Sequence, residues 1–231
     1  HLALARRTRN LSSLRIALKA LRASVSLSHR KSDTVTCAIR YRNLGSALHE
    51  MAERTSDVEM LREAVVACRT SLTFLNEADD TDFWAASQSN LGASIQKLGE
   101  FERDSAHLEQ AIALHTSALR VRKRNGDLKD WADSQNNLGL TYRWVAELNK
   151  DLAAFDKAQA AYDLCLQERP RETTPFDWAT TQWNLADLAL ARYALDPDAA
   201  LLTKACTHVM AAREVFAEAS DYQTERCDGL L

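Results

Sequence analysis

Apolar and small residues recur along this chain at spacings of three and four, which is typical of one face of an α-helix. One such stripe contains Trp84, Gln88, Leu91, Gly92 and Ile95, and a matching stripe follows 47 residues later. No alternating apolar and polar pattern bounded by turns is present. The pattern therefore predicts amphipathic helices along the chain and no sheet.

The same short segment occurs four times, at a period of 47 residues. The copies are Tyr41-Arg-Asn-Leu-Gly45, Gln88-Ser-Asn-Leu-Gly92, Gln135-Asn-Asn-Leu-Gly139 and Gln182-Trp-Asn-Leu-Ala186. A fixed period of this size is the signature of stacked helical repeats, which build an extended surface. We therefore predict an all-α fold, an α-α superhelix of antiparallel helix pairs.

Each repeat is predicted to contain a first helix, helix A, and a second helix, helix B. Helix A follows a capping residue at five matching positions: Asp33, Asp80, Asp127, Thr174 and Asp221. Helix B begins near Leu61, Leu108, Phe155 and Leu202. Glycine inside a helix costs about 1 kcal/mol relative to alanine. Its recurrence at Gly45, Gly92 and Gly139, with Ala186 in the fourth repeat, indicates that another helix approaches closely there.

We expect a single solenoid over residues 1–231. Its predicted parts are a partial repeat over 1–30, full repeats over 33–79, 80–126, 127–173 and 174–220, and a degenerate C-terminal cap over 221–231. Residues 1–9 would be the end of a helix A whose beginning is missing. The parent protein is therefore expected to extend further at its N-terminus.

Composition narrows the possible partners and compartments. The 231 residues are 46% hydrophobic, which is ample for a core, and the net charge of −3 argues against a nucleic-acid binder. No apolar run approaches 18 residues, so no membrane association is expected. The five cysteines are widely spaced without zinc-binding spacing, which favours free thiols in a reducing cytoplasm.

The sequence contains none of the common catalytic, zinc-binding or phosphate-binding motifs. The six histidines form no H-E-x-x-H motif, and the chain contains no glycine-rich phosphate loop and no G-x-S-x-G. An enzyme would need a Cys/His pair brought together across repeats. We therefore predict no catalytic residues, no metal site and no cofactor.

The small residues at these places in a helix pair resemble the tetratricopeptide repeat. The third full repeat matches with Leu138-Gly139, Ala158, Tyr162, Cys165 and Pro170, and the second with Leu91-Gly92, Ala111, His115 and Ala118. The usual unit has about 34 residues, and the longer unit here is similar to repeats of large bacterial multidomain proteins. The resemblance implies a right-handed superhelix whose concave groove, lined by A helices, binds a peptide or a partner domain.

Positions of helix A opposite the core stripe are predicted to face this groove. The candidate binding residues among them are Arg42, Lys97, Asn136, Arg143, Trp144 and Trp183. Tryptophan and arginine dominate binding hot spots, so we predict that the two tryptophans are exposed anchors. Alternatively, they fill space within the solenoid or contact the adjacent helix.

One position outside the core stripe carries asparagine in all four repeats: Asn43, Asn90, Asn137 and Asn184. An amide offers both donors and an acceptor, so it can bind a peptide backbone without reading its sequence. Some peptide-binding tetratricopeptide proteins use such an asparagine ladder. Alternatively, each asparagine bonds to a neighbouring helix or loop, or is simply inherited from duplication.

Together these features predict a non-catalytic protein-interaction scaffold, part of a larger bacterial protein. It would bind a peptide segment or a partner domain in its concave groove. The partner would be another protein or another domain of the same parent chain. The alternative is a regulatory or sensory module that binds a small peptide or ligand and changes the shape of the superhelix.

Overall fold

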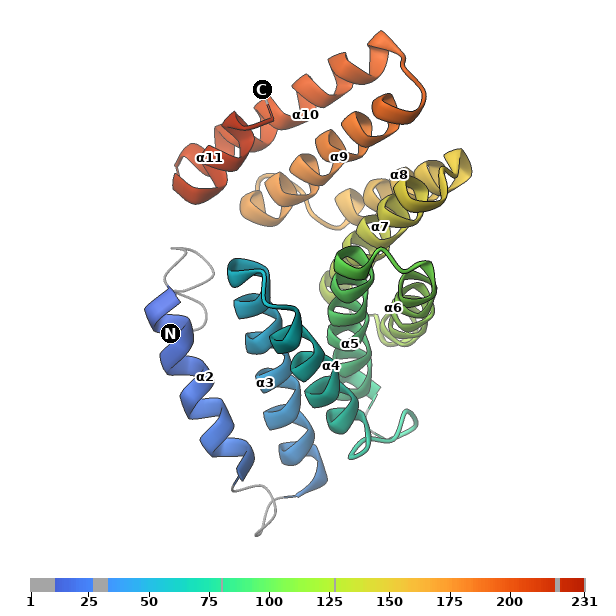
Figure 1. The fold of residues 1–231 in the computed structure, drawn as a ribbon. Coiled ribbons are helices and arrows are strands. Elements are labelled where there is room, and N and C mark those ends of the chain that lie inside the picture. Colours follow the sequence, from blue (N-terminus) through green and yellow to red (C-terminus); the bar gives the residue numbers. More distant parts are fainter. Residues whose placement is uncertain (1–10, 27–32, 80, 127, 219–220, 231) are drawn as a thin grey trace. The chain divides into compact units, whose positions relative to one another are not determined.

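The computed structural model describes residues 11–26, 33–79, 81–126, 128–218 and 221–230. Every regular element within these ranges is an α-helix, and helices adjacent in sequence pack in pairs (Figure 1). They are α2 (Leu11–Ser26), α3 (Thr34–Thr55), α4 (Val58–Leu72), α5 (Thr81–Glu102), α6 (Ser105–Asn125), α7 (Leu128–Asn149), α8 (Leu152–Gln167), α9 (Pro175–Leu195), α10 (Ala199–Ala217) and α11 (Asp221–Asp228). The predicted all-α solenoid of helix pairs is confirmed, while its handedness stays a prediction.

The chain divides into two compact units, His1–Gly126 and Asp127–Leu231. Unit 1 contains α2 to α6, and unit 2 contains α7 to α11. We call α3, α5, α7 and α9 the A helices and α4, α6, α8 and α10 the B helices. Within each unit neighbouring A helices pack against each other, α3 against α5 and α7 against α9.

The glycines of the A helices lie where a B helix approaches closely, as the sequence predicted. A Cβ atom added to Gly92 would lie 2.7 Å from Cε1 of His115, and one added to Gly139 would lie 2.7 Å from Cε1 of Tyr162. The corresponding residues in the first and fourth repeats are Gly45 opposite Cys68 and Ala186 in the same core cluster as Val209. The small residue therefore determines how large a side chain the B helix can place against it.

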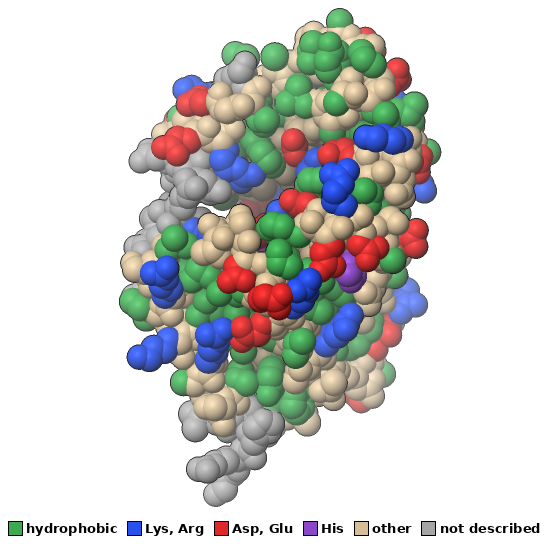
Figure 2. All heavy atoms as spheres, in the orientation of Figure 1, with side chains coloured by type: hydrophobic (Ala, Val, Ile, Leu, Met, Phe, Trp, Pro, Cys, Tyr) green, Lys and Arg blue, Asp and Glu red, His purple; other side chains and the backbone are tan. Residues whose placement is uncertain are grey.

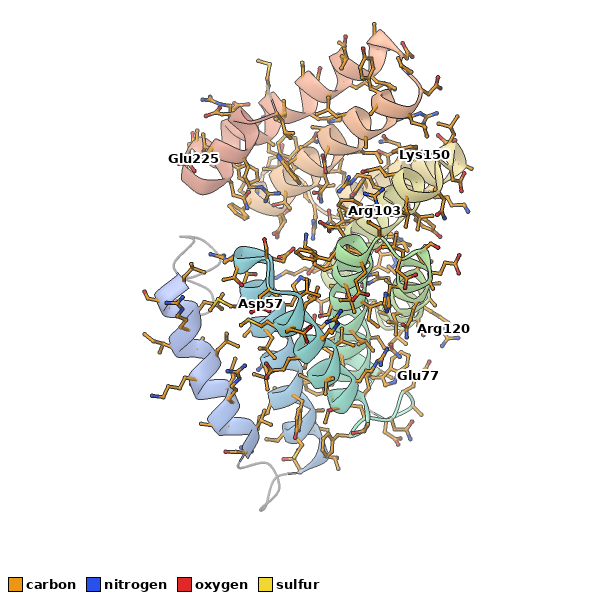
Figure 3. All side chains as sticks on the ribbon, viewed as in Figure 1. Asp57, Glu77, Arg103, Arg120, Lys150 and Glu225 are labelled. Carbon is orange, nitrogen blue, oxygen red and sulfur yellow. The ribbon has the colours of Figure 1, made fainter. Side chains whose placement is uncertain are left out.

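The turn from helix A to helix B has the same backbone conformation in three repeats. Ser56, Arg103 and Lys150, spaced one repeat apart, have φ values of 54°, 53° and 58° (Figure 3 labels the last two). This left-handed conformation closes the end of helix A, and the amide of Ser56 bonds to a carbonyl of the last turn of α3. The fourth repeat has Pro197 at this position, and because its ring fixes φ near −65°, the turn differs there.

Aspartates that the sequence analysis missed cap the B helices. Asp57, Asp104, Asp151 and Asp198 each accept a hydrogen bond from a backbone N–H in the first turn, at 2.9–3.0 Å. The B helices therefore begin about one turn earlier than expected. Recurrence of aspartate at the repeat period was the signal that could have located these caps.

The predicted caps of the A helices have mixed outcomes. Asp33 caps α3 as predicted, because its Oδ1 accepts from the N–H of Thr36 at 2.7 Å. Thr174 occupies the cap position of α9, but its side chain makes no capping bond and donates to the Pro170 carbonyl instead. Asp221 is the first residue of α11 rather than the residue before it. The predicted caps Asp80 and Asp127 lie outside the described residues.

Candidate partner-binding surface

In unit 2, two predicted binding residues bond to each other. The Nδ2 atom of Asn184 on α9 donates to Oδ1 of Asn136 on α7 at 2.9 Å, and Thr181 donates to the same oxygen at 3.5 Å. Asn184 is 6% exposed. At this repeat the amide joins neighbouring A helices, which is the structural role weighed for the asparagines.

The other three asparagines are arranged differently. The side chains of Asn43, Asn90 and Asn137 are half-buried and make no hydrogen bond to any described residue. Asn43 and Asn90 lie on the adjacent helices α3 and α5 of unit 1, and Asn137 lies on α7 of unit 2. No hydrogen bond within the described residues therefore accounts for these three amides.

Arg143 is largely buried and held by two carboxylates. It is 7% exposed, its Nη1 pairs with Glu147 on the same helix, and its Nη2 lies 3.2 Å from Oδ2 of Asp187 on α9. The guanidinium also lies 4.5 Å from the ring centroid of Trp144. Arg143 thus joins α7 to α9 and holds the Trp144 ring, and its charge is neutralised within the unit.

The two tryptophans, predicted to be exposed, are half-buried, and their role as anchors stays a prediction. Trp183 packs on a core cluster of α9 and α10 and lies under the guanidinium of Arg226 on α11, 4.0 Å from the ring centroid. Its Nε1 is buried and has no hydrogen-bond partner among the described residues. Contact with the adjacent helix, the alternative considered for the tryptophans, accounts for the position of Trp183.

In unit 1, the predicted cation Lys97 is also paired. Its Nζ lies 2.7 Å from Glu100 on α5 and 3.9 Å from Glu53 on α3, and 5.5 Å from the Phe101 ring centroid. Arg42, on α3, is half-buried. Acidic, basic and apolar side chains are interspersed on the face shown in Figure 2. The A helices thus present paired charges rather than a patch of one sign.

Buried ionisable groups of the B helices are unsuited to proton transfer at neutral pH. Burial, and to a smaller extent the nearby charge of Arg122, lower the pKa of His115 to about 3. Burial also raises the pKa of Tyr162 and raises the pKa of Cys68 to about 12. These side chains lie against the A-helix glycines and serve packing. His115 is fully buried.

One group of potential metal ligands occurs among the described residues, at the turn between α5 and α6. It contains Glu102, Asp104 and His107, with the His107 Nδ1 atom 3.1 Å from Asp104 and 3.4 Å from Glu102. Asp104 is the helix cap, and Glu102 also pairs with Arg62 at 2.6 Å. We therefore assign this group to capping and ion pairing.

The described helices include none that is both long enough and apolar enough to cross a membrane.

Comparison with known proteins is consistent with the helix-pair geometry. Residues 84–120, which lie in α5 and α6, match the family model described as a tetratricopeptide repeat. No curated protein matches the chain. The chain is similar in fold to the crystal structure of BtubC (BKLC) from P. vanneervenii, with 18% sequence identity and a TM-score of 0.53. The alignment covers 96% of this chain and 88% of that one. Residues 84–120 thus match a tetratricopeptide repeat, and the helical-repeat fold of the chain is consistent with a protein of the tetratricopeptide-repeat type.

Proposed function

We propose that this chain is a non-catalytic scaffold whose A helices bind an extended segment of a partner protein or domain. Tetratricopeptide repeats generally mediate protein–protein interactions, and their all-helical fold is typically non-catalytic. The observation that carries the proposal is that the amides of Asn43 and Asn90, on the adjacent helices α3 and α5 of unit 1, and that of Asn137 in unit 2 make no hydrogen bond to a described residue. The proposal places the scaffold in the cytoplasm as part of a larger bacterial protein, and its five free cysteines support a reducing compartment.

The spacing of the A helices suits an extended peptide. Packed helices lie about 8–10 Å apart, and an extended chain advances about 3.3 Å per residue. Asn43 and Asn90, on the adjacent helices α3 and α5, would therefore meet about every third residue of the peptide. Each amide can donate to a peptide carbonyl and accept from a peptide N–H, so affinity would depend little on the sequence bound. The remaining groove residues would then supply specificity.

The test is affinity capture from an extract of the source organism, followed by calorimetric titration of the captured segment. A variant with Asn43→Ala, Asn90→Ala and Asn137→Ala should bind about a hundredfold more weakly, since each lost hydrogen bond contributes about 1 kcal/mol. The matched control changes three exposed polar residues of the B helices, Gln110→Ala, Thr116→Ala and Gln167→Ala. It should bind like the wild type. Unchanged affinity of the asparagine variant, with circular dichroism showing that it is folded, would refute the proposal.

A further inference from the structure

Unit 2 contains a cavity between the B helices α8 and α10, with the A helix α9 between them. Its volume is about 390 Å³, which lies in the range of about 300–1,000 Å³ typical of small-molecule sites. Buried apolar side chains line it, namely Phe155, Leu185 and Leu188. No residue of the proposed partner-binding surface is among its lining residues. The cavity is therefore a separate candidate site.

The charged side chains of the cavity leave one cation uncompensated. The Arg192 guanidinium on α9 donates to Oδ1 of Asp156 on α8 at 2.6 Å, so these two charges neutralise each other. Lys204 on α10 is exposed and forms no ion pair with any described residue. An anionic ligand group at the rim would therefore gain a partner in Lys204 without breaking an existing ion pair.

The neutral polar side chains of the cavity are already held by partners. His208 Nδ1 lies 2.6 Å from Oε1 of Gln182, and Gln159 Nε2 donates to Asp163 at 2.9 Å. Burial lowers the pKa of His208, so its ring is neutral at pH 7. The cavity thus combines an apolar base with fixed neutral groups and one free ammonium group.

The equivalent position in unit 1 also has a cavity, which indicates that the repeat fold itself generates this space. That cavity lies between α4 and α6, and it too has an ion pair between a B helix and an A helix, Arg62 with Glu102. Its volume is about 280 Å³, below the usual range for ligand sites. The cavity of unit 2 is therefore the stronger candidate.

We propose that the unit 2 cavity binds a small hydrophobic carboxylate. The alkyl or aryl body would lie on Phe155, Leu185 and Leu188, and the carboxylate would pair with the Lys204 ammonium group at the rim. Apolar burial provides the attraction, and the ion pair selects an acid over a neutral molecule of the same shape.

The test is titration of the full chain with octanoate, observed through the methyl NMR signals of its leucines. Octanoate should shift the signals of Leu185, Leu188 and Leu201, which line the cavity. Neutral 1-octanol, which has the same alkyl body, should bind more weakly. Lys204→Glu should weaken octanoate binding about tenfold, because attraction is replaced by repulsion at an exposed site. Lys129→Glu changes another exposed lysine, on α7 and outside the cavity lining, and should leave octanoate affinity unchanged.

Equal binding of octanoate and octanol, or an unchanged octanoate affinity in Lys204→Glu, would overturn the carboxylate assignment. Absence of shifts at the three leucines in the wild-type chain would overturn the site itself. A second variant, Gln159→Trp, places a bulky side chain at an exposed rim position of α8 and should block binding. The asparagine variant described above should still bind octanoate, so failure of either proposal can be recognised separately.

Discussion

At the scale of single residues, the packing between an A helix and its B helix depends on one pair of side chains. Gly92 faces His115 and Gly139 faces Tyr162, whereas the fourth repeat has an alanine at this place and the smaller Val209 in the same cluster. Both large rings are fully buried and cannot turn away. The size of the A-helix residue therefore limits the size of its B-helix partner.

This dependence can be measured in a double-mutant cycle. Gly92→Ala would normally stabilise a helix, but here it should destabilise the protein by about 1–3 kcal/mol because the new methyl group overlaps His115. Adding His115→Val reproduces the pair found in the fourth repeat and should restore most of that loss. Urea denaturation of all four proteins gives the coupling energy, expected to exceed about 1 kcal/mol. A coupling near zero would show that the pair packs independently.

His115 should also make stability depend on pH. Its folded pKa of about 3 lies below the ordinary value of 6.5, so the unfolded chain binds the proton more tightly. The stability that neutral His115 contributes to the folded state is fully present above pH 6.5. It is lost as the pH falls towards 3, by about 1.4 kcal/mol per pH unit. His115→Tyr, which copies the third repeat, should remove this slope. Because carboxylates titrate in the same range, the difference between the two proteins' unfolding free energies is the informative quantity, and parallel curves would contradict the prediction.

At the scale of elements, the three left-handed turns show what sequence alone conceals. Ser, Arg and Lys carry none of the preference for positive φ that marks glycine or asparagine, so nothing at Ser56, Arg103 or Lys150 signals this conformation. The turn is imposed by the two helices that it joins. By contrast, the capping aspartates beside these turns follow an ordinary sequence rule and could have been found.

Replacing Arg103 or Lys150 with glycine should therefore stabilise the chain. Glycine adopts positive φ without the steric cost that other residues incur. The relief of this strain should exceed the entropic cost of ordering glycine on folding by about 0.5–1 kcal/mol. Thermal unfolding should show a higher Tm for each variant. The control is Glu218→Gly, an exposed position at the end of α10 with φ of −85°, where glycine should lower Tm. A lower Tm for both turn variants would mean that the native Arg103 and Lys150 side chains stabilise the fold by more than the backbone strain destabilises it.

At the scale of the whole molecule, periodicity was sufficient to predict an all-α solenoid and the close approach of a B helix at Gly92. The hydrogen bonding of the asparagine that recurs in all four repeats was not predictable, because the bond made by Asn184 depends on Asn136 of a neighbouring helix. The partial burial of Trp183 could not be predicted from the sequence for the same reason, since Arg226 of α11 lies over its ring. The position of a residue on its helix determines the direction in which its side chain leaves the backbone, whereas the neighbouring helices determine which residues that side chain contacts.

The distribution of thiols gives a measure of folding for the entire chain. Cys206 is exposed, and the other four cysteines, Cys37, Cys68, Cys165 and Cys227, are buried. Ellman's reagent should therefore modify one thiol rapidly in the native protein and all five in guanidinium chloride. Cys206→Ser should abolish the rapid phase. Rapid modification of a second thiol in the native state would show that one of the buried cysteines is accessible in solution.

The facing pair of a small residue and a large one also determines how this architecture could be rebuilt. An A helix with glycine tolerates a histidine or tyrosine on its B helix, whereas one with Ala186 is matched to valine. Exchanging single helices between repeats would therefore create overlaps or voids, while exchanging complete A–B pairs would preserve the contact. The helix pair, rather than the individual helix, is the interchangeable module for recombination and for engineering longer or shorter arrays.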